Sequence, residues 1–160
     1  MVETILTLCR LSGVSGWEDS VREYLIKEAE PYADEMRTDA SGNLLIRKQG
    51  RKRAKREVML AAHMDEVGIL IKSVTQEGFL RFAFVGGVDQ RVIIGKKVYV
   101  GENRIPGVIG LKPIHLTSAK ERKTIPEVSQ MYLDIGANTK EEALRRVEAL
   151  TDRFPLYPEA

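Results

Sequence analysis

The most informative stretch of this sequence is Ala61-Ala62-His63-Met64-Asp65-Glu66-Val67-Gly68. It follows the apolar run 58–62, which is short and typical of a buried strand. Side chains two positions apart on a strand project from the same face, so His63 and Asp65 are expected to lie together. A carboxylate beside an imidazole suits a metal ligand, because the carboxylate fixes the orientation of the ring. The motif alone equally allows a histidine that is simply hydrogen-bonded to its neighbour.

The composition is that of a globular protein with room for one core or two small modules. The chain has 160 residues, of which 43% are hydrophobic and 30% charged, and its net charge is +2. Seven basic residues lie between Arg47 and Arg56. No aromatic residue interleaves them to stack on bases, so we interpret the run as a solvated turn between strands and expect no nucleic-acid binding.

The single cysteine excludes an internal disulfide and a thiolate zinc cluster. Cys9 follows Ile5, Leu6 and Leu8 on an apolar helical face, which predicts a buried, reduced thiol. The first residues lack the pattern of a signal peptide, and no apolar run approaches the ~20 residues of a membrane span. These features predict a cytoplasmic protein without a membrane partner.

The first third of the chain alternates helical and strand-like patterns. A helix is expected over 2–11, and a second helix begins with the capping box of Ser15 and Glu18 and ends at Pro31. Two short strands are expected over 34–38 and 43–48, joined by a turn over 39–42. This order suits the edge of an α/β sandwich.

After Gly68 the pattern changes to short strand-like runs separated by glycine-containing turns. Such spacing predicts a small β-barrel or β-sandwich. The expected strands are 69–71, 79–82, 92–94, 97–100, 107–109 and 130–135, with a loop over 112–127. A final helix is expected over 139–150, with Thr139 and Glu142 as a capping box and Ala143, Leu144, Val147 and Leu150 facing inward.

Seven stretches, in order, carry a resemblance to a known family. They are 12–16, 39–44, 61–68, 85–89, 107–110, 112–116 and 134–137, and together they span roughly residues 5 to 145. The chain resembles the tetrahedral (glutamyl-type) aminopeptidases, which are two-metal peptidases. The resemblance implies an α/β fold: a partial α/β sandwich of the zinc-peptidase type with an inserted β-rich, barrel-like dimerisation domain. The implied domains are 1–67 (catalytic part), 68–138 (dimerisation) and 139–160 (helix and tail).

The resemblance also implies roles for particular residues. His63 corresponds to a metal ligand, and Asp65 belongs to the catalytic machinery as the partner that orients the ring. The implied cofactor is a pair of divalent ions, zinc or cobalt, which polarise a peptide carbonyl and activate water. The implied substrates are peptides, cleaved at their N-terminal residue. A homo-oligomer is expected, with contacts at Val85–Arg91 and Lys112–Leu116, where His115 has a structural role.

The remaining metal ligands and the glutamate base of the family have no counterpart in this sequence. A catalytic zinc usually has three protein ligands, so we expect a truncated chain that is inactive alone and associates through uncovered apolar faces. One alternative is a non-catalytic assembly module derived from the family. Another is glycoside hydrolysis, since relatives have been labelled endoglucanases, with Asp65, Glu66 and Asp89 as the available carboxylates.

Overall fold

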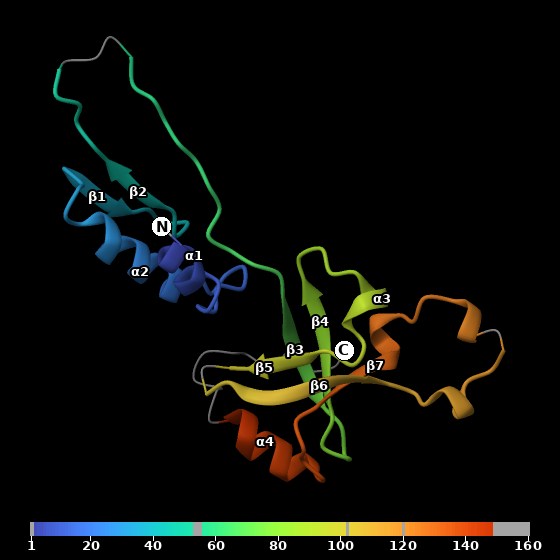
Figure 1. Cartoon of the computed structure of the whole chain (residues 1–160). Coiled ribbons are helices and arrows are strands. Elements are labelled where there is room, and N and C mark those ends of the chain that lie inside the picture. Colours follow the sequence, from blue (N-terminus) through green and yellow to red (C-terminus); the bar gives the residue numbers. More distant parts are fainter. Residues whose placement is uncertain (1, 53–55, 102, 120, 149–160) are drawn as a thin grey trace. The chain divides into compact units, whose positions relative to one another are not determined.

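The computed structural model describes residues 2–52, 56–101, 103–119 and 121–148, and the expected burial of Leu150 lies outside this part. The chain divides into two compact units, Met1–Glu66 and Val67–Ala160. The first unit contains both helices and strands, and the second is mainly β (Figure 1). No helix among the described residues combines the length and the apolarity needed to cross a bilayer.

The described residues of the N-terminal unit form two helices and a two-stranded hairpin. They are α1 (Val2–Leu8), α2 (Asp19–Ala29), β1 (Glu35–Thr38) and β2 (Leu44–Arg47), with β1 and β2 antiparallel. The predicted turn forms because the Asp39 carboxylate accepts hydrogen bonds from the backbone N–H groups of Ser41 and Asn43, both at 2.9 Å. Arg22 on α2 donates from Nε to the Gly42 carbonyl at 2.8 Å, which ties the helix to this turn. Both predicted strands are therefore confirmed.

The apolar run Val58–Ala62 does not form the predicted strand. Val58, Met59 and Leu60 are 86%, 88% and 93% exposed, and no strand of the described residues pairs with them. The local pattern is that of a strand, but a strand exists only when neighbouring N–H and C=O groups complete its ladder. The prediction of a buried strand before His63 is therefore wrong for this chain.

Two predictions about the first helices are also wrong. Cys9 is exposed and lies just after α1, which ends at Leu8. The apolar helix residues Ile5 and Leu6 are exposed as well, so the apolar face of this helix is not buried. Ser15 does not cap α2: the helix begins later, after Glu18, whose side chain makes no capping hydrogen bond. The Ser15 hydroxyl is used elsewhere, as described below. The predicted end of this helix before Pro31 is confirmed.

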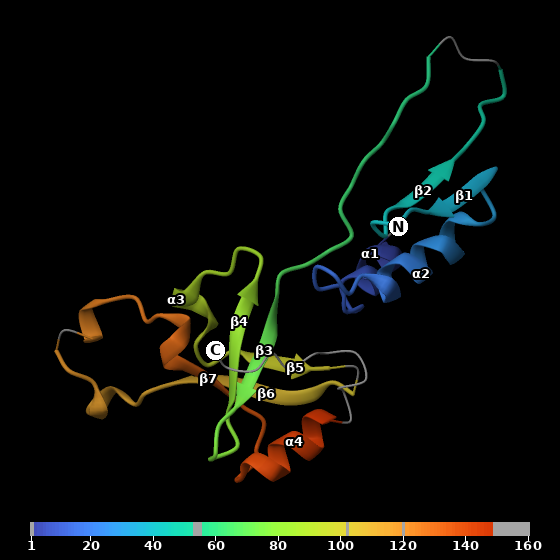
Figure 2. The ribbon, with the colours of Figure 1, turned by 180° about the vertical axis from the view of Figure 1, so that it is seen from behind.

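The C-terminal unit is built on a curled, five-stranded antiparallel sheet, which Figure 2 shows from behind. The strand order is β3-β4-β7-β6-β5. The bounds are β3 (Gly68–Val74), β4 (Leu80–Val85), β5 (Lys97–Val100), β6 (Ile105–Leu111) and β7 (Met131–Asp134). Three short 3-10 turns, Ile114–Leu116, Glu121–Lys123 and Val128–Gln130, lie between β6 and β7. Five of the six strands predicted in this half are confirmed.

The exception is the run 92–94, which was predicted to be a strand. It belongs to α3 (Gln90–Ile93), a single helical turn. Asp89 is its N-cap and accepts a hydrogen bond from the Arg91 backbone N–H at 2.9 Å. An N-capping aspartate outweighs the β-branched residues that follow, because it satisfies an otherwise unpaired donor of the first turn.

The core of the molecule lies almost entirely in the C-terminal unit. Of the buried hydrophobic residues among those described, only Val21 belongs to the N-terminal unit. The others form one cluster beneath the sheet: Leu80, Phe82, Val100, Ile109, Met131, Leu133, Ile135, Ala137, Ala143 and Val147. Helix α4 (Lys140–Glu148) contributes the last two, as its apolar spacing predicted. The β-rich half therefore carries most of the hydrophobic stabilisation.

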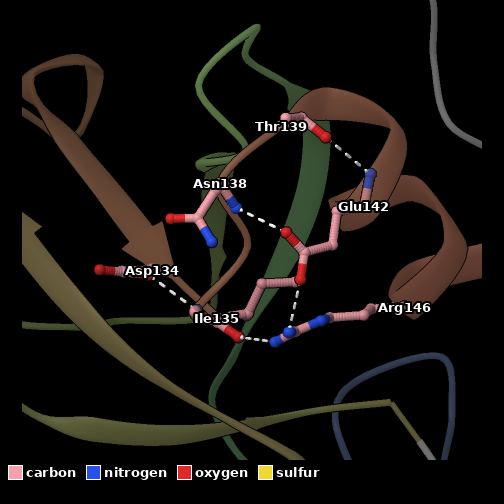
Figure 3. Close-up of polar contacts among 7 residues, drawn as sticks. Asp134, Ile135, Asn138, Thr139, Glu142 and Arg146 are labelled. Carbon is pink, nitrogen blue, oxygen red and sulfur yellow. Dashed lines mark hydrogen bonds and ion pairs between the residues drawn. The ribbon is translucent and has the colours of Figure 1, made fainter.

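The start of α4 is fixed by a polar cluster, drawn in Figure 3. Thr139 Oγ1 accepts from the Glu142 N–H at 3.2 Å, as the predicted capping box requires, but the Glu142 carboxylate accepts from the Asn138 N–H rather than from Thr139. This backbone hydrogen bond, aided by Arg146, lowers the pKa of Glu142 below its ordinary value. Arg146 also donates to the Ile135 carbonyl at 2.7 Å, so the cluster links the helix to the end of β7.

The pair of Asp89 and Arg91 gives a pH prediction. The Arg91 side chain and backbone N–H lower the pKa of Asp89 from 3.8 to about 2. A depressed pKa means that the stabilisation is present above the unfolded pKa and is lost as the pH falls through about 2. We expect Arg91→Ala to raise this pKa towards 3.8, measured by the ¹³C carboxyl shift of Asp89. Lys96→Ala is the control, and a wild-type pKa near 3.8 would contradict the prediction.

Candidate functional site

His63 and Asp65 are brought together as predicted, although they lie on an irregular segment and not at a strand end. His63 Nδ1 is 2.9 Å from the backbone carbonyl of Asp65 and 3.0 Å from its Oδ1 atom. A carbonyl oxygen only accepts hydrogen bonds, so Nδ1 must carry the proton. In the neutral ring, this assignment leaves the lone pair on Nε2. The side chain of His63 is 85% exposed, so this nitrogen is accessible to a ligand.

Asp65 has a second partner on its other oxygen. The hydroxyl of Ser15 donates to Asp65 Oδ2 at 2.5 Å. The Ser15 hydrogen bond is the main cause of the lowered pKa of Asp65, and the nearby His63 contributes. Asp65 is therefore held as a carboxylate between a hydroxyl group and an imidazole.

The backbone segments that carry Ser15 and Asp65 are hydrogen-bonded to each other next to these side chains. The Glu66 N–H donates to the Gly13 carbonyl at 2.7 Å, and the Gly13 N–H donates to Glu66 Oε1 at 3.3 Å. Val14 and Glu66 form an isolated parallel bridge. The segment 13–15 is thereby clamped to the segment 65–66, and Glu66 serves this clamp.

An open pocket of about 270 Å³ lies beside His63 within the N-terminal unit. Its lining is largely apolar, with Leu8, Leu11 and Leu25 from the helical region and Glu66 as a carboxylate. An apolar recess next to an exposed imidazole can receive a hydrophobic side chain of another polypeptide segment or of a ligand.

The described residues fit one position of a metal site but do not complete a site. His63 offers an imidazole nitrogen whose tautomer is fixed as metal ligands require. No group of three or more His, Cys, Asp and Glu side chains that could hold an ion occurs among the residues that the structure describes. His115 lies in the 3-10 turn Ile114–Leu116 of the C-terminal unit.

The carboxylates considered for glycoside hydrolysis each have a structural partner. Glu66 accepts a hydrogen bond from Gly13, and Asp89 forms an ion pair with Arg91 at 2.6 Å. Asp65 is bound by Ser15 and His63. No observation in the structure favours this alternative.

Sequence reasoning missed Ser15 as part of the site. Its place before Glu18 suggested a helix cap, and this local interpretation hid a partner fifty positions away. The signal that pointed to the site was the stretch 12–16, which carried part of the family resemblance.

Gly13 provides a prediction on the integrity of the site. A Cβ atom at this position would lie 2.8 Å from Val21 Cγ2 and 3.3 Å from the Met64 carbonyl oxygen. Because Val21 is buried, Gly13→Ala is expected to destabilise the N-terminal unit by about 1–3 kcal/mol, the usual cost of overpacking. The fluorescence of Trp17, the single tryptophan, reports unfolding of this unit. Gly50→Ala, with only an ordinary contact to Lys52 at 3.5 Å, is the control, and equal stability of the two variants would contradict the prediction.

Comparison with known proteins places the chain in a family of peptidases. The family model described as M42 glutamyl aminopeptidase matches residues 42–154. The lysyl aminopeptidase of Pyrococcus furiosus is 32% identical over 135 residues, covering 82% of this chain and 38% of the relative. The chain spans about two-fifths of the length of the curated relatives that it matches.

Solved structures of peptidases are also similar to this chain. The TET aminopeptidase of Thaumarchaeota archaeon SCGC AB-539-E09 is 36% identical, with a TM-score of 0.83 over 91% of this chain and 41% of that chain. The TET1 peptidase of Pyrococcus horikoshii, described as assembling into a tetrahedron or a large octahedral shell, is 38% identical with a TM-score of 0.72 over 90% of this chain and 43% of that chain. With a family match over most of its length, this chain belongs to the M42 glutamyl aminopeptidase family.

Proposed function

We propose that this chain contributes part of the active site of a metal-dependent aminopeptidase that removes N-terminal residues from peptides. His63 binds a divalent ion through Nε2, and Asp65 orients the ring. The observation that carries the proposal is the pair of contacts from His63 Nδ1 to the carbonyl and to the carboxylate of Asp65, which leaves Nε2 as the unprotonated nitrogen. Family membership supplies the class of reaction.

A divalent ion such as zinc or cobalt, held in part by His63, would supply the polarisation of the peptide carbonyl and the activation of water. The described residues hold the His63 imidazole in the tautomer that a metal ligand needs and keep the neighbouring carboxylate of Asp65 ionised. Lowering of the Asp65 pKa by Ser15 supports the second role. Since the described residues offer no group of three ligands, we infer that the 160-residue chain alone does not hydrolyse peptides.

The finer architecture is part of the same proposal. Residues 1–67 would form part of an α/β sandwich, residues 68–138 a barrel-like dimerisation domain, and residues 139–160 a C-terminal helix and tail. The compact unit that begins at Val67 supports the first of these boundaries. The exposed apolar residues Val58, Met59 and Leu60 offer a surface that a sandwich could bury.

A homo-oligomer is proposed on two grounds. Ile114 and Leu116 are exposed apolar residues within the expected contact region 112–116, and Val92 is exposed just after 85–91. The TET1 peptidase of Pyrococcus horikoshii is described as assembling into a tetrahedron or a large octahedral shell. A non-catalytic assembly module remains the second candidate, since most of the core lies in the β-rich unit.

Binding of Co²⁺ to the purified chain tests the role of His63. His63 and His115 are the two histidines, so each ring can be followed in a ¹H–¹⁵N spectrum of the side chains. We expect Co²⁺ to shift the Nε2 resonance of His63 and to leave His115 unchanged, and His63→Ala to abolish the response. A response from His115 alone, or none from His63 at saturating cobalt, would overturn the proposal.

A further inference from the structure

We propose that Ser15 is a positioning residue for the metal-binding histidine: its hydroxyl holds the Asp65 carboxylate in the orientation that keeps the proton of His63 on Nδ1. This inference deepens the proposed function and rests on it. It concerns a residue from the loop before α2, far in sequence from the histidine that it serves.

The first step of the argument is how the two oxygens of Asp65 are used. Oδ2 accepts the Ser15 hydroxyl at 2.5 Å, while Oδ1 lies 3.0 Å from His63 Nδ1. With one oxygen fixed by Ser15, the plane of the carboxylate is set, and the other oxygen is aimed at the ring. Asp65 is on a segment without helix or strand, so its own backbone imposes little on the side-chain rotamer.

The second step is that Ser15 is itself held in place. The neighbouring residues Gly13 and Val14 are joined to Glu66 by the backbone hydrogen bond at 2.7 Å and by the parallel bridge. The Trp17 N–H donates to the Val14 carbonyl at 2.7 Å and closes the turn that contains Ser15. The hydroxyl is therefore presented from a fixed turn, which is what a positioning group needs.

The third step is the exposure of the ring. The His63 side chain is 85% exposed and that of Asp65 is 40% exposed. Among the residues that the structure describes, the hydrogen bonds of the imidazole are both on its Nδ1 side. An exposed ring without a fixed acceptor exchanges between its two neutral tautomers. Only the tautomer with the proton on Nδ1 offers Nε2 to a metal. The backbone carbonyl of Asp65 accepts from Nδ1 at 2.9 Å whatever Ser15 does, and the hydroxyl that fixes the carboxylate adds a second acceptor on the same side. Ser15 thus raises the population of the metal-binding form above the level that the carbonyl alone gives.

The test measures the tautomer of His63 in the metal-free chain. Side-chain ¹H–¹⁵N spectra at a pH of about 8.5, where an ordinary imidazole is neutral, report the ratio of the Nδ1–H to the Nε2–H form. Ser15→Thr and Ser15→Val form a matched pair, because the two residues have nearly the same shape and differ in the hydroxyl. Ser12→Ala changes an exposed serine of the same loop and is the control, and His115 is the internal reference.

We expect wild type, Ser15→Thr and Ser12→Ala to keep the Nδ1–H form dominant. In Ser15→Val the ratio should fall by roughly fivefold, the factor that corresponds to one hydrogen bond of about 1 kcal/mol. Equal ratios in the threonine and valine variants would overturn the proposal and leave Ser15 with a merely structural role, as would a dominant Nε2–H form in the wild type.

The same samples separate this inference from the proposed function. If His63 responds to Co²⁺ but its tautomer is insensitive to Ser15, the positioning role fails while the ligand role stands. If the tautomer depends on the Ser15 hydroxyl but Co²⁺ leaves His63 unchanged, the contact geometry is right and the proposed metal role fails. Should Ser15→Val lose the fold, seen by Trp17 fluorescence, Ser15→Ala replaces it in the comparison with Ser15→Thr.

Discussion

Gly78→Ala is expected to lower the free energy of unfolding of the C-terminal unit by about 2–5 kcal/mol. Gly78 lies in the β3–β4 turn with a φ of +86°, and an added Cβ would lie 2.8 Å from the Ala137 carbonyl oxygen and 2.9 Å from that of Thr139. The left-handed conformation costs a residue with a Cβ atom about 1–2 kcal/mol, and overpacking costs about 1–3 kcal/mol more. Both neighbours are backbone atoms, so neither can rotate away.

Two other glycines of the same unit separate these causes. Gly95 has a φ of +76° with open space around it, so Gly95→Ala reports the backbone strain alone. Gly87 has open space and no positive φ, so Gly87→Ala is the neutral control. Hydrogen exchange of the Ile109 amide, which donates to the Lys96 carbonyl at 3.1 Å, measures unfolding of this unit. Equal protection in the Gly78 and Gly95 variants would show that the contact with the segment before α4 is not tight.

Leu133→Ala is the second substitution with a large expected effect, a loss of about 2–5 kcal/mol. Leu133 is fully buried on the central strand β7, paired with Leu80 on one side and Ile109 on the other. Removing its side chain leaves a cavity between three strands and beneath α4, where the sheet cannot easily collapse. The loss should appear as faster exchange of the Ile109 amide.

Val108→Ala is the matched control for this substitution. Val108 lies on the adjacent strand β6 but is 47% exposed, so its truncation should change the stability by less than about 0.5 kcal/mol. If both variants exchanged alike, the buried cluster would not be the source of stability in the β-rich unit.

The β-rich half could be predicted from the sequence because its signals are local. Alternating apolar residues give the strands, and glycines with positive φ, such as Gly78 and Gly86, give the turns between them. The spacing of Ala143 and Val147 correctly indicated the buried face of α4. The run 92–94 differs from its strand prediction for a local reason as well, because the capping carboxylate of Asp89 outweighs the β-branched residues that follow.

The N-terminal half could be predicted less well because its apolar residues depend on partners. Val58, Met59 and Leu60 have the pattern of a buried strand, yet within the described residues nothing covers them. Cys9 likewise lies on an apolar helical pattern that predicts burial, yet it is exposed. A pattern indicates which surface is suited to burial, but burial itself requires a second surface.

The candidate site shows the same division between local and distant information. The contact between His63 and Asp65 follows from their spacing and could be predicted, whereas Ser15 is positioned by tertiary hydrogen bonds to Asp65. No periodicity in the sequence links residues fifty positions apart. A serine before an acidic residue has an obvious local role as a helix cap, and this role competed with the correct one.

We propose that this chain carries a histidine ligand of a metal-dependent aminopeptidase. The most direct test is to join the chain to the unmatched part of the lysyl aminopeptidase of Pyrococcus furiosus and to measure hydrolysis of aminoacyl chromogenic substrates with zinc or cobalt. We expect turnover by the joined protein, none by the 160-residue chain alone, and none after His63→Ala. Turnover that survives His63→Ala, or hydrolysis by the chain alone, would contradict the proposal.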